Sequence, residues 1–301
     1  MSELADSAID LHEVETAIAA AIRGGGIAGL RLLGHGEISI VLAWPQAEPT
    51  VALKRVPPFR NAAEARRYVD ACHGFFDTMR EANVAIWPTE LLTLVRADGK
   101  AVVYHRQPIA DAAQLGSNVL RNATPADSHP LLDAIADAAS RVCGPTVGFD
   151  VQLANWLWDG TTATQLDFTS PFTLTPGGKD ITYDSHAFLQ EYPVLMRPYL
   201  KRELTKIIRR YTTAEGALAD MVSNMLKEGL DVWVDPAIAT INQRLGTTLQ
   251  REAAQAMLDE DRKFMPMVLK LKKSQRWWLH HTGRRYEALL PDETTYDRNR
   301  T

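Results

Sequence analysis

The first third of the chain changes from a helical to a strand-like spacing of its hydrophobic residues. Residues 8–23 place apolar side chains at every third or fourth position, which predicts an amphipathic helix that the glycines at 24–26 end. Three apolar runs follow at 27–33, 38–44 and 50–56, and connections rich in glycine or proline separate them. This spacing predicts an antiparallel meander of three strands.

A second helix and a hairpin extend this predicted sheet. Residues 61–82 favour a helix with Asn61 as its N-cap. Its apolar stripe consists of Tyr68, Ala71, Cys72, Phe75, Phe76 and Met79. The runs 91–96 and 101–104 flank the turn residues Asp98-Gly99-Lys100 and predict two more strands. These elements predict a small lobe of five strands and one helix that ends near residue 108.

The remainder of the chain reads as mostly helical. Trp156-Leu157-Trp158 and Gln165-Leu166 flank Asp159-Gly160, which predicts one further hairpin. Helices are expected at 130–142, 186–211, 214–228, 234–244, 249–259 and 261–281. The predicted fold class is α+β and bilobal, with a small antiparallel-sheet N-lobe and a larger, mainly helical C-lobe. The expected domains are an N-terminal helix at 1–26, the N-lobe at 27–108 and the helical C-lobe at 109–301.

Composition narrows the class of protein without indicating its chemistry. The chain has 301 residues, 46% hydrophobic and 23% charged, with a net charge of −4, as in ordinary globular proteins. Nothing in this balance demands nucleic acid or an anionic membrane. The two cysteines lack metal-ligand spacing, the N-terminus lacks an apolar signal segment, and no apolar run approaches the roughly 18 residues of a membrane span. We therefore expect a cytoplasmic protein.

The connection between the first two predicted strands has a glycine pattern that suits a bound phosphate. It reads Gly34-x-Gly36-x-x-Ser39-x-Val41, and glycines there let the backbone N–H groups approach an anion closely. Hairpins also use glycine without any ligand. The third strand reads Val51-Ala52-Leu53-Lys54, which places a lysine beneath the glycine turn. Taken alone, such a lysine more often marks the solvated end of an edge strand.

Three oxygen-bearing side chains surround the predicted hairpin. Asp150 and Asn155 precede it, and Asp167 follows it at the end of an apolar run. Because a hairpin brings its entry and exit together, Asn155 and Asp167 can approach one point. Carboxylate and amide oxygens suit Mg²⁺, which takes hard oxygen ligands. The alternative is a surface hairpin with ordinary polar flanks.

The order of these motifs resembles the protein-kinase-like superfamily. Four motifs occur in the same order along the chain as in that superfamily: the glycine turn, Val51-Ala52-Leu53-Lys54, Asp150-x-x-x-x-Asn155 and Asp167-Phe168. The chain is most similar to the branch of aminoglycoside and other small-molecule phosphotransferases, over about residues 27–175. The resemblance implies ATP and Mg²⁺ as cofactors.

The resemblance also implies a role for each matching residue. Gly34, Gly36 and Ser39 would cover the ATP phosphates. Lys54 would bind the α- and β-phosphates and form an ion pair with Glu64, which lies on the sheet-facing edge of its helix. The backbone near Gln107 would form the hinge that meets adenine. Asp150 would be the catalytic residue that accepts or orients the proton of the acceptor hydroxyl, and Asn155 and Asp167 would hold Mg²⁺.

The sequence departs from the superfamily pattern at three places. Ser39 stands where a third glycine is usual, as happens in the small-molecule branch. Gly148-Phe149 precede Asp150 where this branch usually has His-Gly, so we expect weaker orientation of the loop. Thr169 follows Asp167-Phe168 in place of glycine, which predicts a metal loop that is stiffer or differently shaped.

These residues imply an ATP- and Mg²⁺-dependent phosphotransferase that transfers the γ-phosphate to an alcohol group. The expected acceptor is a small-molecule hydroxyl compound such as a natural product. One alternative is a kinase of Ser or Thr in a peptide during its maturation. Another is a nucleotide-binding pseudokinase that serves as an interaction module, which the missing loop histidine favours. The presence of all four groups that touch phosphate, metal and acceptor favours an enzyme.

Two stretches of the C-terminal half are strongly basic. Lys201, Arg202, Lys206, Arg209 and Arg210 lie close together, and residues 262–285 contain eight Lys or Arg and no acidic residue. Such runs usually form solvated helix faces. The functional interpretation is a surface for an acidic partner, acceptor or peptide leader. The negative overall charge does not favour nucleic acid.

Overall fold

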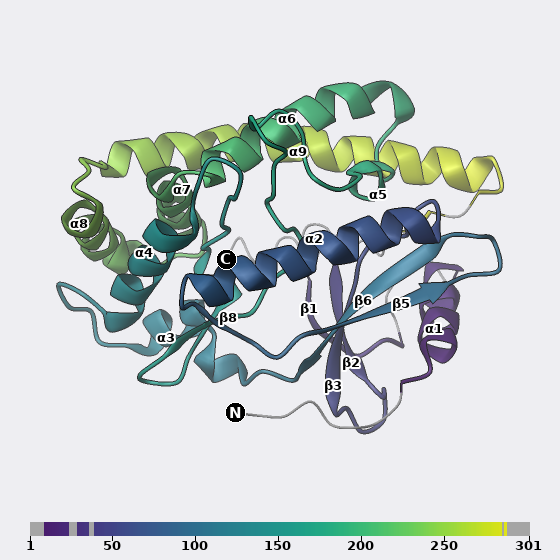
Figure 1. Ribbon diagram of the computed structural model, residues 1–301, viewed down its shortest axis with the longest axis horizontal. Helices are drawn as coiled ribbons and strands as arrows, with labels where there is room; N and C mark the ends of the chain where they lie inside the picture. Colours follow the sequence, from purple (N-terminus) through teal and green to yellow (C-terminus); the bar gives the residue numbers. More distant parts are fainter. Residues whose placement is uncertain (1–8, 24–28, 36–38, 285, 288–301) are drawn as a thin grey trace.

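The first part of the molecule is built on a five-stranded antiparallel sheet. The computed structural model describes residues 9–23, 29–35, 39–284 and 286–287. The strand order is β1-β2-β3-β6-β5. The bounds are β1 Leu32–His35, β2 Ile40–Trp44, β3 Val51–Arg55, β5 Glu90–Val95 and β6 Ala101–Pro108. The predicted α+β class is confirmed, because a mainly helical part follows this sheet (Figure 1).

One helix covers each face of the sheet. On one face, Val14 and Ile18 of α1 (Leu11–Arg23) pack in a core cluster with Leu53 of β3 and Tyr104 of β6. On the other face, α2 (Ala62–Glu81) packs its apolar stripe against alternate residues of β6, including Val103. Successive strand residues point to opposite faces, so β3 sends Leu53 and Arg55 toward α1 while Lys54 points to the other side.

The helical part forms its own large core. Its helices are α3 Gly116–Asn122, α4 Pro130–Val142, α5 His186–Leu189, α6 Arg197–Tyr211, α7 Ala214–Lys227, α8 Val234–Leu245 and α9 Arg251–His281. Helix α4 packs against α8, and α7 packs against both α8 and α9. In Figure 1, α4, α7 and α8 gather at the left, away from the five-stranded sheet. The predicted domain limits at residues 26 and 108 stay predictions, although β6 ends at Pro108.

A small three-stranded sheet carries the predicted hairpin. Strands β7 (Trp156–Trp158) and β8 (Ala163–Gln165) pair antiparallel, and β4 (Ala85–Ile86) adds to β8 in parallel. The Asp159 side chain stabilises the turn by accepting hydrogen bonds from the backbone N–H groups of Thr161 and Thr162, at 2.9 and 2.8 Å. The hairpin thus has the predicted turn, and β4 connects it to the chain segment that follows α2.

Two helix predictions are wrong in their limits. The predicted helix at 186–211 is divided into α5, a short 3₁₀ turn at Val194–Met196 and α6. A proline restricts the residue before it to extended backbone, so Pro193 interrupts the helix, whereas Pro198 is tolerated in the first turn of α6. In contrast, the predicted helices at 249–259 and 261–281 are one helix, α9, with Pro266 inside it.

A helix that spans a membrane has to be both long and apolar. None of the helices in the part of the chain that the structure describes combines that length and apolar character.

Candidate functional site

A buried ion pair lies where the sheet meets the hairpin. The Nζ atom of Lys54 on β3 lies 2.9 Å from Oδ1 of Asp167, which follows β8. Burial raises the pKa of Asp167, but the ammonium of Lys54 and the hydrogen bonds from Thr169 outweigh it and lower the pKa to about 2. Asp167 is therefore a carboxylate at neutral pH. The structure brings together the predicted phosphate-binding lysine and the predicted metal ligand.

Thr169 explains how the loop after Asp167 is held without the usual glycine. Its backbone N–H and its hydroxyl both donate to Oδ1 of Asp167, at 2.9 and 2.7 Å. Lys54 contacts the same oxygen. Among the described residues, Oδ2 of Asp167 accepts no hydrogen bond, and the side chain is 35% exposed. One carboxylate oxygen is thus fixed, while the other is available to a ligand.

Asp150 lies beside this pair and holds its proton unusually strongly. Burial raises the pKa of its carboxyl group, the nearby charges of Asp220 and Asp167 add to this, and the pKa reaches about 7. Oδ1 accepts a hydrogen bond from the backbone N–H of Gln152 at 3.2 Å. The Gln165 side-chain amide contacts the carbonyl oxygens of both Asp150 and Asp167, at 3.3 and 3.2 Å. This amide therefore couples the two loops that carry the predicted catalytic and metal-binding carboxylates.

The loop before Asp150 is anchored without the histidine usual in the superfamily. The backbone N–H groups of Gly148 and Phe149 donate to the carbonyl oxygens of Phe172 and Tyr211, at 2.6 and 3.0 Å. A Cβ atom at position 148 would lie 3.0–3.1 Å from these two residues, so glycine permits the close approach. The ring of Phe149 is fully buried. Backbone hydrogen bonds and an aromatic anchor therefore hold this loop, and the weaker orientation expected without the histidine stays a prediction.

Asn155 ends a short 3₁₀ turn, Leu153–Asn155, directly before β7. Its backbone carbonyl accepts a hydrogen bond from the N–H of Leu166 at 2.8 Å, which closes the base of the hairpin. Its side chain donates a hydrogen bond to Asp150, and this bond opposes the rise in the pKa of that group. Asn155 thus lies beside Asp150, and its backbone holds the end of the hairpin that precedes Asp167.

Asp220 on α7 is a site residue that the sequence did not indicate. Its Oδ2 atom accepts hydrogen bonds from the Tyr211 hydroxyl at 2.6 Å, from the Asn224 amide at 3.0 Å and from the Gln152 amide at 3.3 Å. Burial raises the pKa of Asp220. No motif links it to Asp150, which lies 70 positions earlier, and only the packing of α7 against the loop brings the two carboxyl groups near each other.

The predicted ion pair between Lys54 and Glu64 is absent from the structure, although both residues are described. Asn61 caps α2 as predicted, accepting from the N–H of Glu64 at 2.9 Å. The Glu64 carboxylate binds the Nε and backbone N–H of Arg60, at 2.7 and 3.2 Å. The Arg60 guanidinium also contacts Asp184 at 2.5 Å. Helix side chains point toward the N-terminus, so Glu64 reaches back to Arg60, while Asp167 neutralises Lys54.

Tyr68 connects α2 to the metal loop in place of that ion pair. Its hydroxyl donates to the carbonyl oxygen of Thr169 at 2.7 Å and lies 2.8 Å from Nε2 of His105. Because the only hydroxyl hydrogen goes to Thr169, the Nε2–H of His105 must donate to Tyr68. Burial, followed by the charge of Lys54, lowers the pKa of His105 to about 3, so its ring is neutral. Tyr68 follows Glu64 by one helical turn. Because it belongs to the apolar stripe, the sequence indicated a core residue and not this polar connection.

The glycine turn is only partly described. Gly34 belongs to β1 and pairs with Val41 of β2 after a break in the strand register. Gly36 lies outside the described residues. Ser39 is buried at the start of β2. The flanking strand β1 lies at the edge of the sheet, and β2 pairs with β3, which carries Lys54.

The predicted hinge uses its side chains to join the lobes. Gln107 pairs with Ala52 across β3 and β6. Its side-chain amide donates to the Thr89 hydroxyl and to the Leu166 carbonyl oxygen, at 2.8 and 2.9 Å. The indole N–H of Trp87 donates to the carbonyl oxygen of Pro108 at 3.0 Å. Gln107 therefore lies at the junction of the sheet and the hairpin, within the chain segment expected to meet adenine.

The site has few metal-binding groups of its own. Within the described ranges, no cluster of three or more His, Cys, Asp or Glu side chains could hold a metal ion. The two carboxylates and one amide at the site would have to share a cation with water or phosphate oxygens. That donor set fits Mg²⁺, which is commonly held by one or two carboxylates together with substrate phosphates.

Comparisons with known proteins identify a family but no activity. The model of a family described as "Family of unknown function (DUF6206)" matches residues 14–276. No curated protein matches the chain. Solved structures do match, among them "WaaP in complex with acyl carrier protein", which is 14% identical, with a TM-score of 0.38, over 85% of this chain and 91% of that one. At this similarity, the activity of this chain has to be judged from its own side chains.

Proposed function

The chain belongs to the Family of unknown function (DUF6206), and we propose that it is an ATP- and Mg²⁺-dependent phosphotransferase with an alcohol group as acceptor. The observation that carries this proposal is the 2.9 Å contact between Lys54 and Asp167, with Asp150 joined to the same loop through Gln165. A phosphate-binding cation, a metal-binding carboxylate and an acid–base carboxylate are the three parts that phosphoryl transfer requires.

The residues present fit Mg·ATP. Lys54 is a buried cation with one carboxylate partner, and the phosphates of ATP would provide the further anionic oxygens. Asp167 keeps its Oδ2 free of hydrogen bonds within the described residues, so it and Asn155 would hold Mg²⁺. When bound, Mg²⁺ neutralises negative charge on the phosphate groups. Gly34, Gly36 and Ser39 would cover the phosphates, and the backbone near Gln107 would receive adenine.

Asp150 has the properties of the acid–base group. Its pKa of about 7 means that a substantial fraction is ionised at neutral pH and still basic enough to accept a proton. The carboxylate would accept or orient the hydroxyl proton of the acceptor. Asp167, with its much lower pKa, would remain ionised throughout. Two carboxyl groups with separated pKa values suit two different tasks.

The acceptor that we propose is a small molecule or natural product that offers a hydroxyl group near Asp150. Asp220 and Gln152 flank that position, and their oxygens suit a partner rich in hydrogen-bond donors. Ser or Thr of a peptide would satisfy the same chemistry. The exposed lysines and arginines of α6 would then suit an acidic part of the acceptor or leader.

Measurement of ATP consumption against a panel of hydroxyl compounds and Ser/Thr peptides tests the proposal. With the true acceptor, Asp150→Asn should keep Mg·ATP binding and lose turnover by about 10²- to 10⁴-fold, the range for a positioned acid–base group. Asp159→Asn, at the exposed hairpin turn, is the matched control and should keep its activity. If the wild type binds Mg·ATP but transfers phosphate to no acceptor, including water, the protein is a pseudokinase.

A further inference from the structure

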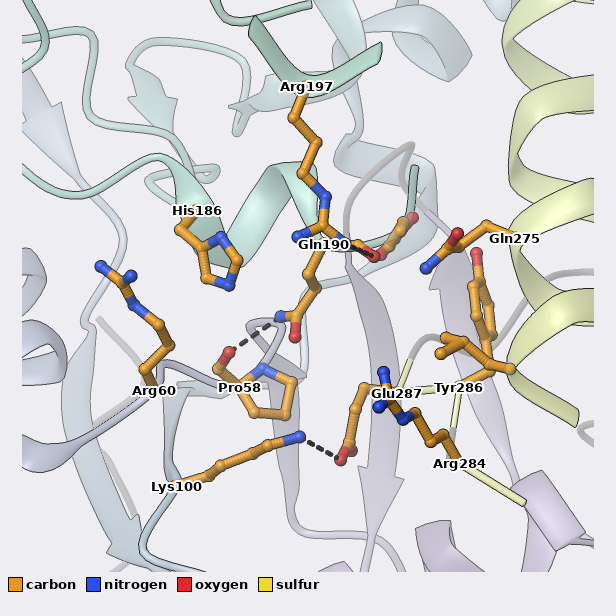
Figure 2. Close-up of a pocket in the computed structure, with 12 residues that line it drawn as sticks. Pro58, Arg60, Lys100, His186, Gln190, Arg197, Gln275, Arg284, Tyr286 and Glu287 are labelled. Atoms are coloured by element: carbon orange, nitrogen blue, oxygen red, sulfur yellow. Dashed lines mark hydrogen bonds and ion pairs between the residues drawn. The ribbon is translucent and has the colours of Figure 1, made fainter. Parts of the chain in front are cut away.

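A cavity lined by both charged and apolar groups lies outside the candidate site, since neither Asp150 nor Lys54 lines it. It has a volume of about 350 Å³ and lies between the connection from β3 to α2, the turn between β5 and β6, helix α5 and the end of α9. This volume is within the range of small-molecule sites. Its described lining contains none of the residues assigned to nucleotide, metal or acceptor. Figure 2 shows His186, Gln190 and Arg197 above the cavity and Pro58, Lys100 and Glu287 below it.

Arg197 gives one wall of the cavity a positive charge without a counter-ion. It lies in the first turn of α6, half-buried. Its guanidinium donates to the backbone carbonyl oxygens of Tyr192 and Gln190, at 3.0 and 3.2 Å. No carboxylate within the described residues forms an ion pair with it. Burial lowers the pKa of Arg197, but an arginine stays charged in a protein. An anion in the cavity would supply the missing charge.

His186 and Arg60 add hydrogen-bond donors to the lining of the cavity. Burial lowers the pKa of His186, and the charges of Arg60 and Arg197 lower it further, so both guanidinium groups act on this imidazole. Arg60 is also held by Glu64 and Asp184. Two guanidinium groups and an imidazole form a set of donors suited to the several oxygens of one phosphate group.

Glu191, which also lines the cavity, needs a hydrogen-bond donor. It is 4% exposed, and its Oε2 atom lies 2.9 Å from Nζ of Lys272 on α9. Its Oε1 atom is buried and has no hydrogen-bond partner in the described part of the chain. A buried acceptor without a donor destabilises the fold. A hydroxyl group of a ligand would satisfy it.

We propose that this cavity binds a small phosphate ester that also carries hydroxyl groups. The phosphate lies among Arg60, His186 and Arg197, and a hydroxyl donates to Oε1 of Glu191. The site is separate from the proposed nucleotide site. The guanidinium of Arg60 that would contact the phosphate also holds Glu64 on α2.

Calorimetric titration with glycerol 3-phosphate, without ATP, tests this site independently of any transferase activity. The wild type should bind glycerol 3-phosphate more tightly than inorganic phosphate, and should not bind glycerol. Arg197→Gln should weaken binding at least 10-fold. Arg202→Gln is the matched control, since Arg202 is exposed on the same helix and does not line the cavity; it should bind like the wild type.

Two further variants keep the test decisive. Lys54→Met should retain the binding, whereas its loss there would place the probe in the nucleotide site and overturn the proposal. Arg284→Gln, at an exposed lining residue, serves if Arg197→Gln does not fold, and it should weaken binding several-fold. Absence of binding to the wild type, or equal affinity in the cavity variants and the Arg202 control, would also overturn the proposal.

Discussion

The carboxyl group of Asp150 has a proton affinity far from that of an ordinary aspartate. Its pKa of about 7 follows from burial first and from the neighbouring charges of Asp220 and Asp167 second. An exposed aspartate in the unfolded chain has a pKa near 3.9. Between these two values the folded protein binds a proton that the unfolded chain releases. The ionised form of Asp150 therefore destabilises the fold, and this cost grows as the pH rises from about 4 to about 7.

Asp150→Asn should for this reason stabilise the protein, and more at pH 8 than at pH 5. A pKa unit corresponds to about 1.4 kcal/mol, so the gain in the free energy of unfolding at pH 8 should be on the order of 1–3 kcal/mol. Asp159→Asn is the contrast, because hydrogen bonds from Thr162 and Thr161 lower the pKa of Asp159. Thermal unfolding at both pH values measures the difference. Equal stability of Asp150→Asn and the wild type at pH 8 would contradict this assignment.

The sequence indicated the candidate chemical residues but not their partners. Lys54, Asp150, Asn155 and Asp167 are recognisable because each stands in a short motif with fixed spacing. Asp220 has no such motif, and its position near Asp150 depends on how α7 packs. The predicted partner of Lys54 was wrong because two carboxylates compete for one cation, and the sequence does not show which of them is nearer.

At the scale of elements, Tyr68 ties α2 to the loop that carries Asp167. The chain of hydrogen bonds runs from His105 on β6 through the Tyr68 hydroxyl to the Thr169 carbonyl oxygen. Thr169 in turn holds Oδ1 of Asp167. Sheet, helix and metal loop thus share one buried polar contact. This arrangement takes over the connecting role that the sequence assigned to a pair between Lys54 and Glu64.

Tyr68→Phe should remove this connection while keeping the aromatic ring in the core. The Thr169 carbonyl oxygen and the His105 N–H would each lose their partner, at a cost of roughly 1–3 kcal/mol. Tyr199→Phe is the control, since Tyr199 is 46% exposed. Urea unfolding should show the loss for Tyr68→Phe alone, and its Mg²⁺ requirement for turnover should rise. The same free energy of unfolding in both variants would exclude a structural role for the hydroxyl.

The local hydrophobic pattern predicted the regular strands and helices, but it predicted only some of the places where a helix is interrupted. Apolar runs predicted the five strands, although β1 covers Leu32–His35 where 27–33 was predicted, and the stripe with its Asn61 cap predicted α2 almost to the residue. Two prolines differ in their effect on helices. Pro193 interrupts a predicted helix, whereas Pro266 lies within the continuous helix α9. The packing of α7 and α8 against α9 decides the second case, and such packing between segments distant in sequence is not visible in the local pattern.

At the scale of the whole molecule, α9 joins the segment after α5 through a buried ion pair. Lys272 and Glu191 are 6% and 4% exposed and lie 2.9 Å apart. The basic stretch at 262–285 is therefore not a uniform surface. Lys270 is exposed, as expected of a partner-binding face, but Lys272 is part of the core. The proposal of an acidic partner at this stretch is confined to the exposed residues.

Lys272→Ala should destabilise the protein, while Lys270→Ala should not. Removing one member of a buried pair leaves the other charge without compensation, which costs about 3–5 kcal/mol. Glu191 can reduce this cost by taking up a proton, since burial already raises its pKa. We therefore expect a loss of about 2 kcal/mol or more. Chemical denaturation of the two variants measures this loss of stability. Equal denaturation midpoints would indicate that Lys272 belongs to a solvated helix face instead.

The central claim, that Lys54 and Asp167 form the Mg·ATP site between the sheet and the helical part, is tested most directly by calorimetric titration with Mg·ATP. The wild type should bind the nucleotide with one site per chain. Lys54→Met should abolish binding, whereas Lys201→Met, at an exposed lysine of α6, should leave the affinity unchanged. Absence of binding to the wild type, or equal affinity in wild type and Lys54→Met, would contradict the account.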